Sequence, residues 1–180
     1  LQNLNSSKKA QMLINFGGIG HFKLLKKIIA VITELPQFEY TLITGLLIPT
    51  EANKISEFLR TTNIHLLNST TEMAKLMSNS QFALGASGST VWERFTLGVN
   101  SALIDMADNQ KNLLTFLDQQ NLVDNLGNVN QINEVDIYQY IKRLEINSKL
   151  YQNRKLQIMN LVDGLGTIRV SQTILDYIRK

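Results

Sequence analysis

Cysteine is absent from the 180-residue chain, and histidine occurs only twice. The lack of cysteine excludes disulfides, a thiolate nucleophile and the cysteine-rich zinc sites, and it fits a reducing compartment. Two histidines leave little from which to build a metal site. The sequence offers no Ser-His-Asp set, no paired acidic catalytic site and no metal-ligand spacing. We therefore expect no metal and no resident cofactor, and we assign no catalytic residue.

Long apolar runs and blocks of basic charge are also lacking. No apolar run reaches the roughly 18 residues of a membrane span, and the N-terminal sequence LQNLNSSKKAQ lacks the apolar segment of a signal peptide. The formal net charge is +3, with lysine and arginine spread along the chain. This distribution predicts no nucleic-acid partner. We expect a cytoplasmic protein that does not span a membrane.

The composition is that of one globular domain. Hydrophobic residues make up 44% of the chain, enough for one good core and too few for two at this length. Residues 1–10 are polar and linker-like, so the predicted domain covers residues 11–180. The sequence does not begin with methionine, and we expect it to be a piece of a longer protein.

Short apolar runs alternate with amphipathic stretches along most of the chain. The runs predict strands at residues 11–16, 40–44, 63–67, 81–85, 101–105 and within 121–127. Helical spacing, capping patterns and a terminating proline or glycine predict helices up to residue 35, then at 51–60, 69–77, 90–97, 109–119, 134–146, 148–161 and 167–179. This alternation is typical of an α/β fold with a doubly wound, mostly parallel six-stranded sheet, Rossmann-like, followed by a helical C-terminal segment.

Two glycine-rich loops follow the first and fourth predicted strands. They read Gly17-Gly18-Ile19-Gly20 and, from Gly85 to Thr90, GASGST. If the strand order is 3-2-1-4-5-6, these two strands flank the point where the order reverses, and a crevice opens there at their carboxyl ends. Each loop leads into a helix, whose free N–H groups and positive dipole end favour an anion. The sequence therefore predicts a phosphate site between the two loops.

The same loop residues also have purely structural explanations. Gly17 to Gly20 fits a tight turn, and the serines and threonine of GASGST fit helix caps. Thr90 and Glu93 have the spacing of a capping box, in which the glutamate bonds the backbone of the capping residue. Asp163 to Gly166 fits a turn between two helices.

Other polar or aromatic residues near these loops also favour structural roles. Trp92 is expected to be buried in the packing, His21 to be solvated in a first helical turn, and His65 to lie in the core or on a face of the sheet. Asp108 or Asn109 is expected to cap the helix that follows the fifth strand.

Three stretches together resemble a known enzyme family. These are residues 73–77 (MAKLM), 82–110 (FALGASGSTVWERFTLGVNSALIDMADNQ) and 161–166 (LVDGLG). They are similar to the C-terminal, nucleotide-binding half of GT-B-type UDP-sugar enzymes. The closest likeness is to the UDP-sugar hydrolases of pseudaminic acid biosynthesis. A more distant likeness is to the transferase that adds N-acetylglucosamine to a lipid-linked muropeptide.

The resemblance implies a ligand, UDP or a UDP-sugar, and a role for each matched residue. The loop after the fourth strand would hold the diphosphate, Glu93 the ribose hydroxyls, and Asn109 and Gln110 the phosphates or the sugar. The third strand would lie beside the uracil through Ile64 and Leu66. The full set of expected binding residues is Gly17, Gly18, Ile64, Leu66, Ser87, Gly88, Ser89, Thr90, Glu93, Asn109 and Gln110.

The chain departs from the family in two respects. The first loop of the family commonly reads G-G-S-D, whereas this chain has Gly17-Gly18-Ile19-Gly20 and lacks that hydroxyl and carboxylate. The catalytic histidine of the hydrolases belongs to an N-terminal half that these residues do not cover, so the chain alone is expected to be inactive. A glycosyltransferase donor domain and a non-catalytic interaction module remain the alternatives. The apolar residues of the last helix, from 167 to 178, predict that it packs back on its own domain or drives self-association.

Overall fold

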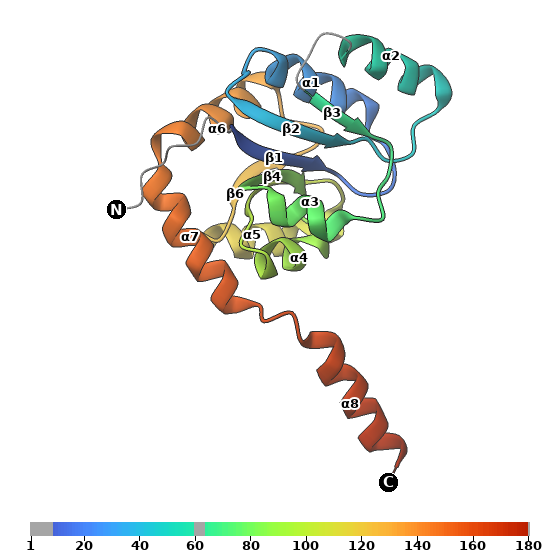
Figure 1. Ribbon diagram of the computed structural model, residues 1–180, viewed down its shortest axis with the longest axis vertical. Coiled ribbons are helices and arrows are strands. Elements are labelled where there is room, and N and C mark those ends of the chain that lie inside the picture. Colours follow the sequence, from blue (N-terminus) through green and yellow to red (C-terminus); the bar gives the residue numbers. More distant parts are fainter. Residues whose placement is uncertain (1–8, 60–63, 180) are drawn as a thin grey trace.

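The computed structural model describes residues 9–59 and 64–179, and its centre is one six-stranded sheet. All neighbouring strands are parallel, in the order β3-β2-β1-β4-β5-β6, so the predicted doubly wound order is confirmed (Figure 1). The strands are β1 (Ala10–Asn15), β2 (Phe38–Ile43), β3 (Ile64–Leu67), β4 (Phe82–Ala86), β5 (Asn100–Asp105) and β6 (Asp124–Asn128). The expected linker at residues 1–10 lies almost wholly outside the described residues. Residue 60, the predicted end of the helix at 51–60, and residue 63, the predicted start of the strand at 63–67, also lie outside them.

Eight helices and one short 3-10 turn connect or follow these strands within the described residues. They are α1 (Phe22–Thr33), α2 (Pro49–Leu59), α3 (Met73–Asn79), α4 (Thr90–Thr96), the 3-10 turn η1 (Asp108–Gln110), α5 (Lys111–Gln119), α6 (Glu134–Ile146), α7 (Ser148–Leu161) and α8 (Gly166–Ile178). The predicted helix at 109–119 is therefore a 3-10 turn followed by a shorter α-helix. None of the described helices is long and apolar enough to cross a membrane.

Alternate residues of the strands face two different cores. On one face, Met12 and Ile14 of β1 pack with α1, α2 and α6. On the other face, Leu13 packs with α3, and Leu103 of β5 packs with α4, α5 and α7. Since both faces are covered, the central strands β4 and β5 are buried almost throughout, as expected for a parallel sheet, whereas the edge strands β3 and β6 are partly exposed.

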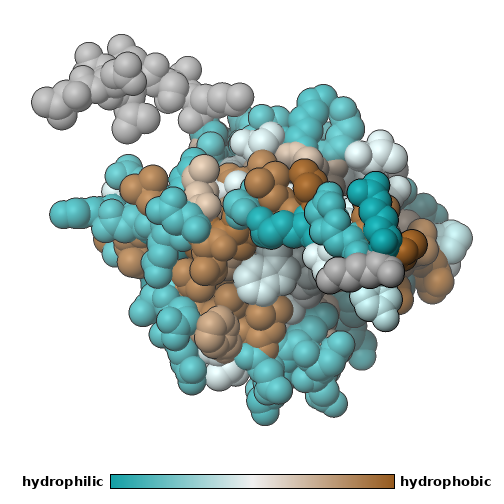
Figure 2. All heavy atoms as spheres, turned by 90° about the horizontal axis from the view of Figure 1, so that it is seen from below, coloured by the Kyte–Doolittle hydropathy of each residue, from teal (hydrophilic) through white to brown (hydrophobic). Residues whose placement is uncertain are grey.

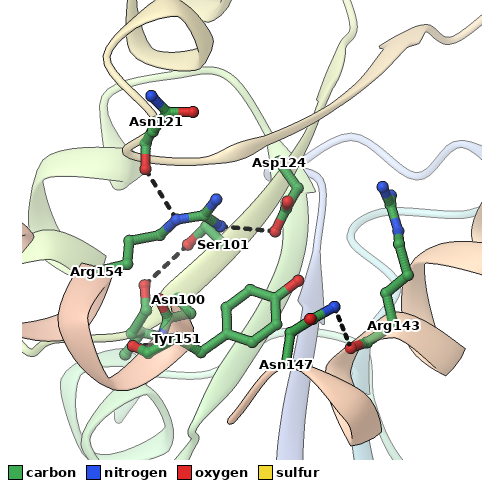
Figure 3. Close-up of polar contacts among 9 residues, drawn as sticks. Asn100, Ser101, Asn121, Asp124, Arg143, Asn147, Tyr151 and Arg154 are labelled. Atoms are coloured by element: carbon green, nitrogen blue, oxygen red, sulfur yellow. Dashed lines mark hydrogen bonds and ion pairs between the residues drawn. The ribbon is translucent and has the colours of Figure 1, made fainter. Parts of the chain in front are cut away.

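Helix α7 is fixed across the β5–β6 edge of the sheet by a buried arginine (Figure 3). Arg154 donates from Nη1 to Oδ2 of Asp124 at 2.7 Å and from Nε to the carbonyl of Asn121 at 2.9 Å. In the same region Asn100 Nδ2 donates to the carbonyl of Tyr151 at 3.0 Å. The guanidinium is only 6% exposed, so the carboxylate of Asp124 offsets a charge that would be costly to bury alone.

The ends of the helices test the predicted caps. The glycine expected to close α4 does so: Gly98 has φ +67°, and the N–H groups of Gly98 and Val99 bond the carbonyls of Phe95 and Arg94. This is a Schellman motif. The capping box expected at Ser69 is wrong, because α3 begins at Met73 after Glu72, which makes no side-chain cap bond.

One capping box was not predicted. Asn133 caps α6 by accepting from the N–H groups of Val135 and Asp136, and the Asp136 carboxylate accepts from the N–H of Asn133. The spacing N-x-x-D was the available signal, with aspartate in the place where glutamate is more usual.

Helix α8 extends away from the sheet domain (Figure 1). The turn predicted at Asp163 to Gly166 precedes it, with Gly164 at φ +74°, and none of its described side chains is buried. The expectation that it packs back on its own domain is wrong. Figure 2, seen from the side on which α8 projects, shows apolar residues gathered in the middle of that face. Self-association stays a prediction.

Candidate functional site

The strand order reverses where β1 and β4 run side by side. Asn15 pairs with Gly85 at the carboxyl ends of the two strands, and each strand continues into its glycine-rich loop. This is the point at which the strand order reverses, and such reversals are where parallel α/β sheets bind ligands.

The loop after β1 is tied to the loop after β2. The N–H of Gly20 donates to the carbonyl of Leu46 at 2.9 Å, and the N–H of Leu46 donates to the carbonyl of Gly18 at 2.8 Å. The N–H of Gly17 is directed to Oδ1 of Asn15 at 3.3 Å. A β-carbon at Gly20 would overlap Leu47. Gly17 and Gly18 are exposed, but most of this loop's hydrogen bonds join it to its neighbour.

The loop after β4 has a different hydrogen-bonding pattern. The N–H of Ser87 donates to the carbonyl of Ile104 at 3.2 Å. Within the part of the chain that the structure describes, the next three N–H groups, of Gly88, Ser89 and Thr90, have no acceptor. Ser89 is exposed, and Gly88 and Thr90 are partly exposed. These three consecutive unpaired N–H groups, in an accessible loop at the start of a helix, form a surface of hydrogen-bond donors that can face an anion.

Gln110 reaches this loop from the next strand connection. Its Oε1 accepts from the N–H of Met106 at 3.2 Å and from Oγ of Ser87 at 3.3 Å. Because a backbone N–H can only donate, Oε1 is the atom held there, and Nε2 is left to donate. Nε2 lies 3.8 Å from the position that a β-carbon would take at Gly88. Ser87 itself is 1% exposed, so its hydroxyl holds Gln110 in place.

The hydroxyl of Thr90 is also oriented as a donor. Nη2 of Arg94 donates to Oγ1 of Thr90 at 2.9 Å. A guanidinium has no acceptor, so Oγ1 accepts in this contact and its own hydrogen is available to another group. Thr90 O–H, Gln110 Nε2–H and the three backbone N–H groups thus give this loop an excess of donors.

Glu93 does not form the expected capping box. Helix α4 begins at Thr90 after Ser89, and Ser89 makes no side-chain cap bond. The Glu93 side chain is exposed, and within the described residues it makes no hydrogen bond or ion pair. It lines a cleft of about 490 Å³ with Trp92, Thr96, Asp163 and Arg169.

The expected burial of Trp92 is wrong. Its side chain is 38% exposed, and only the edge of the indole packs on Phe95, with ring centroids 5.8 Å apart. The buried face of α4 is made instead by Val91, Arg94 and Phe95. Since α4 is only seven residues long, this face leaves no room for the indole.

Several predicted residues lie apart from the donor-rich loop. Ile64 and Leu66 belong to the edge strand β3, which is three strand positions from β4, a separation of roughly 14 Å at about 4.8 Å per strand. Both pack partly against the core on the α1 face. Asn109 is exposed in η1, and within the part of the chain that the structure describes its side chain makes no hydrogen bond to the loop.

The histidines and the expected cap after β5 can also be placed. His65 is exposed on β3, so it does not lie in the core, which was one of its two expected positions. His21, expected to be solvated in a first helical turn, precedes α1 and is half-buried. Neither Asp108 nor Asn109 caps a helix, because η1 follows Ala107 and α5 follows Gln110, both without a side-chain bond. Among residues 9–59 and 64–179, no cluster of three acidic or histidine side chains could hold a metal.

Sequence reasoning missed Arg94 as a component of this region. Its guanidinium lies beside Gly85, where a β-carbon would be 2.6 Å from Nη2 and 2.8 Å from Nη1. The available signal was the position of Arg94 between Val91 and Phe95, on the apolar face of a short helix and four residues after Thr90.

Solved structures share this fold. The chain superposes on MurG of Acinetobacter baumannii with a TM-score of 0.79 and 17% identity, over 98% of this chain and 55% of that protein. The glycotransferase of kitacinnamycin gives 0.77 and 13%, over 97% and 44%. A UDP-GlcNAc 2-epimerase from Neisseria meningitidis, bound to UDP-GlcNAc, gives 0.70 and 18%, over 95% and 45%.

These comparisons establish the fold. It is the Rossmann-like α/β fold of a GT-B half, and the chain spans about half the length of each of these proteins. By sequence, the chain matches no protein-family model and no curated protein.

Proposed function

We propose that this chain is a UDP- or UDP-sugar-binding domain in which the loop from Ser87 to Thr90 holds the diphosphate. The observation that carries the proposal is the donor surface of that loop. Its three unpaired N–H groups, the Thr90 hydroxyl and Nε2 of Gln110 can all donate, and a diphosphate offers only acceptors at neutral pH.

The position of Glu93 supports the proposal that it binds the nucleoside end of the same ligand. Glu93 lies four residues after Ser89 on α4, which at a rise of 1.5 Å per residue places it about 6 Å farther along the helix axis. An ionised carboxylate only accepts hydrogen bonds, and two ribose hydroxyls can donate to it. The uracil is then expected toward the carboxyl end of β3, beyond Ile64 and Leu66.

Gly17 and Gly18 are proposed to let the ligand come close to the backbone rather than to form hydrogen bonds with it. At both positions a β-carbon would meet no atom within 4 Å, so the loop leaves open space on that side of the crevice. Asn109 is exposed next to Gln110 and is proposed to contact the sugar.

The reaction of the whole protein is proposed from the resemblance. In a nucleotide-sugar hydrolase of nonulosonic acid biosynthesis, activated water attacks the donor and UDP leaves with the bonding electron pair. The donors of the Ser87–Thr90 loop would stabilise the charge that develops on the departing diphosphate. The group that activates water would come from a second, N-terminal domain.

A glycosyltransferase donor domain is the second candidate, and it fits the structural neighbours at least as well. One of the solved structures described above is named as the glycotransferase of kitacinnamycin, and a further neighbour is CalG4, the calicheamicin glycosyltransferase. The donor site would be the same in both cases, because only the acceptor, water or a sugar hydroxyl, differs.

Calorimetric titration of the chain with UDP, ADP and inorganic pyrophosphate tests the proposal. We expect UDP to bind more tightly than ADP, pyrophosphate to bind weakly, and no UDP-sugar to be hydrolysed by the chain alone. A chain that binds none of the three ligands is an interaction module whose glycines serve turns. Release of UDP in a single turnover, abolished by His21→Ala, would show instead that this chain is catalytic.

A further inference from the structure

Among residues 9–59 and 64–179, Arg94 is a buried cation without an anionic partner. Its side chain is 2% exposed on the inner face of α4, and Nη1 has no hydrogen-bond partner. Its one side-chain contact is with a neutral group, the hydroxyl of Thr90. The adjacent Glu93 acts on it only through space and lies in solvent. Burying a charge without a paired and hydrogen-bonded partner costs several kcal/mol.

A second buried arginine shows how the same fold treats a structural guanidinium. Arg154 is 6% exposed, and it meets the carboxylate of Asp124 at 2.7 Å and the carbonyl of Asn121. Figure 3 shows both acceptors converging on it. The chain thus supplies a carboxylate to the arginine that only joins helix to sheet, and none to Arg94.

The surroundings of Arg94 place its charge directly under the crevice. The guanidinium occupies the space over Gly85 where a side chain would be, and the carbonyl of Asn15 borders the same space. Gly85 and Asn15 are the paired residues at the ends of β4 and β1. From there Nη2 reaches Thr90, the last residue of the loop that offers the unpaired N–H groups.

Burial lowers the pKa of Arg94 from 12.5 to about 10, while the carboxylate of Glu93, and Tyr140 when it is ionised, act in the opposite direction. Even at the lowered pKa, the guanidinium is protonated at neutral pH. The surrounding side chains exclude water, so this charge is screened less than one on the surface.

We propose that Arg94 is the fixed cation of the diphosphate subsite, and that the bound diphosphate supplies the counter-charge that the ligand-free chain lacks. The inference rests on the proposed function and adds to it one positioning residue that acts through Thr90. Because Oγ1 of Thr90 accepts from Arg94, its hydrogen points away from the guanidinium, and the positive charge makes that hydroxyl a stronger donor to a phosphate oxygen.

The test compares Arg94→Met with the wild type in both stability and ligand discrimination. Methionine keeps much of the volume and removes the charge. We expect the ligand-free variant to be as resistant to urea as the wild type, or more so, because an uncompensated buried charge is gone. We expect its affinities for UDP and pyrophosphate to fall by roughly ten- to a hundredfold, the range for a charge-assisted hydrogen bond. Its affinity for uridine should change less than about twofold.

Arg154→Met is the matched control, since it removes the other buried arginine. It should lower the resistance to urea, because Asp124 loses its partner, and it should leave the ratio of UDP to uridine affinity unchanged. Arg94→Lys keeps the charge and should keep most of the preference for UDP over uridine. Thr90→Val removes the hydroxyl without touching the charge and should reduce that preference.

The outcomes separate this inference from the proposed function. A wild-type chain that binds no UDP overturns both. A wild type that binds UDP, with an Arg94→Met variant that is unstable to urea and binds UDP normally, overturns only the role of Arg94 and makes it a packing residue. If Arg94→Met does not fold, the Arg94→Lys and Thr90→Val variants decide. If both variants prefer UDP over uridine as strongly as the wild type does, the inference is overturned.

Discussion

The guanidinium of Arg94 takes the place of a side chain at Gly85. A β-carbon built on Gly85 would lie 2.6 Å from Nη2, 2.8 Å from Nη1 and 2.6 Å from the carbonyl oxygen of Asn15. Gly85 lies within β4, so its lack of a side chain serves packing: it leaves room for the guanidinium next to the loop that follows β4. This pair links the packing of α4 to the electrostatics of the crevice.

Gly85→Ala is expected to destabilise the fold by about 1–3 kcal/mol, as overpacking of a filled core does. Part of the clash is with the flexible Arg94 side chain and part is with the backbone of Asn15, which cannot move aside. In the double variant with Arg94→Met the loss should be smaller, which a double-mutant cycle of urea unfolding would measure. The control is Gly88→Ala, whose β-carbon would meet only Nε2 of Gln110, at 3.8 Å. Equal losses of stability in the two alanine variants would contradict the arrangement.

Glu93→Ala is expected to weaken UDP by roughly ten- to a hundredfold, because charge-assisted hydrogen bonds to ribose hydroxyls would be lost. The free energy of unfolding should change by less than about 0.5 kcal/mol, since Glu93 is exposed and caps nothing. Pyrophosphate binding should stay the same in calorimetry.

A ribose without its hydroxyls provides the control for Glu93. Removing the hydroxyls from the ligand should weaken binding to the wild type and hardly affect the variant. If the variant discriminates against the deoxygenated ligand as strongly as the wild type does, Glu93 does not hold the ribose.

The sequence predicted the strand order because that order depends on patterns that are local or nearly so. Apolar runs of five or six residues mark buried parallel strands, and the glycine loops after β1 and β4 mark the reversal. Gln110 and Ser87 were among the predicted site residues, and the structure brings them together at 3.3 Å.

What the sequence could not predict depends on tertiary contacts. Charged residues are almost never fully buried without a partner. An arginine in this helix would therefore ordinarily be assigned to its exposed face, whereas Arg94 lies on the inner face of α4. Trp92 was expected inside because indoles usually pack, but a helix of seven residues buries one narrow face, and Val91, Arg94 and Phe95 fill it. His65 is exposed because β3 lies at the edge of the sheet.

Helix α8 is expected to make the chain self-associate. It exposes large apolar side chains on a helix that contacts little else: Ile168, Val170, Ile174, Leu175 and Ile178. We expect the wild type to sediment as a species larger than a monomer, and Ile174→Lys with Ile178→Lys to restore the monomer. Gln172→Lys, on the same helix, is the control for added charge and should leave association unchanged. A monomeric wild type would instead leave the apolar side of α8 for a second domain.

Tyr140→Phe is expected to be neutral or stabilising by up to about 1 kcal/mol at pH 7, because the hydroxyl it removes is buried and has no partner among the described residues. The difference should widen in alkali. Burial, and then the charge of Asp124, raises the pKa of Tyr140 well above its ordinary value of 10.0. Above about pH 10 the unfolded wild type therefore releases a proton that the folded chain retains, and its stability falls as the pH rises. Urea unfolding at pH 7 and near pH 10.5 measures both effects.

Tyr40→Phe is the matched control for Tyr140→Phe. The hydroxyl of Tyr40 donates to the carbonyl of Leu35 at 2.8 Å, so the Tyr40→Phe variant should lose about 1 kcal/mol of stability at pH 7. Loss of stability of the same size in both variants at pH 7 would show that Tyr140 has a partner, such as a buried water, and would remove the basis of the prediction.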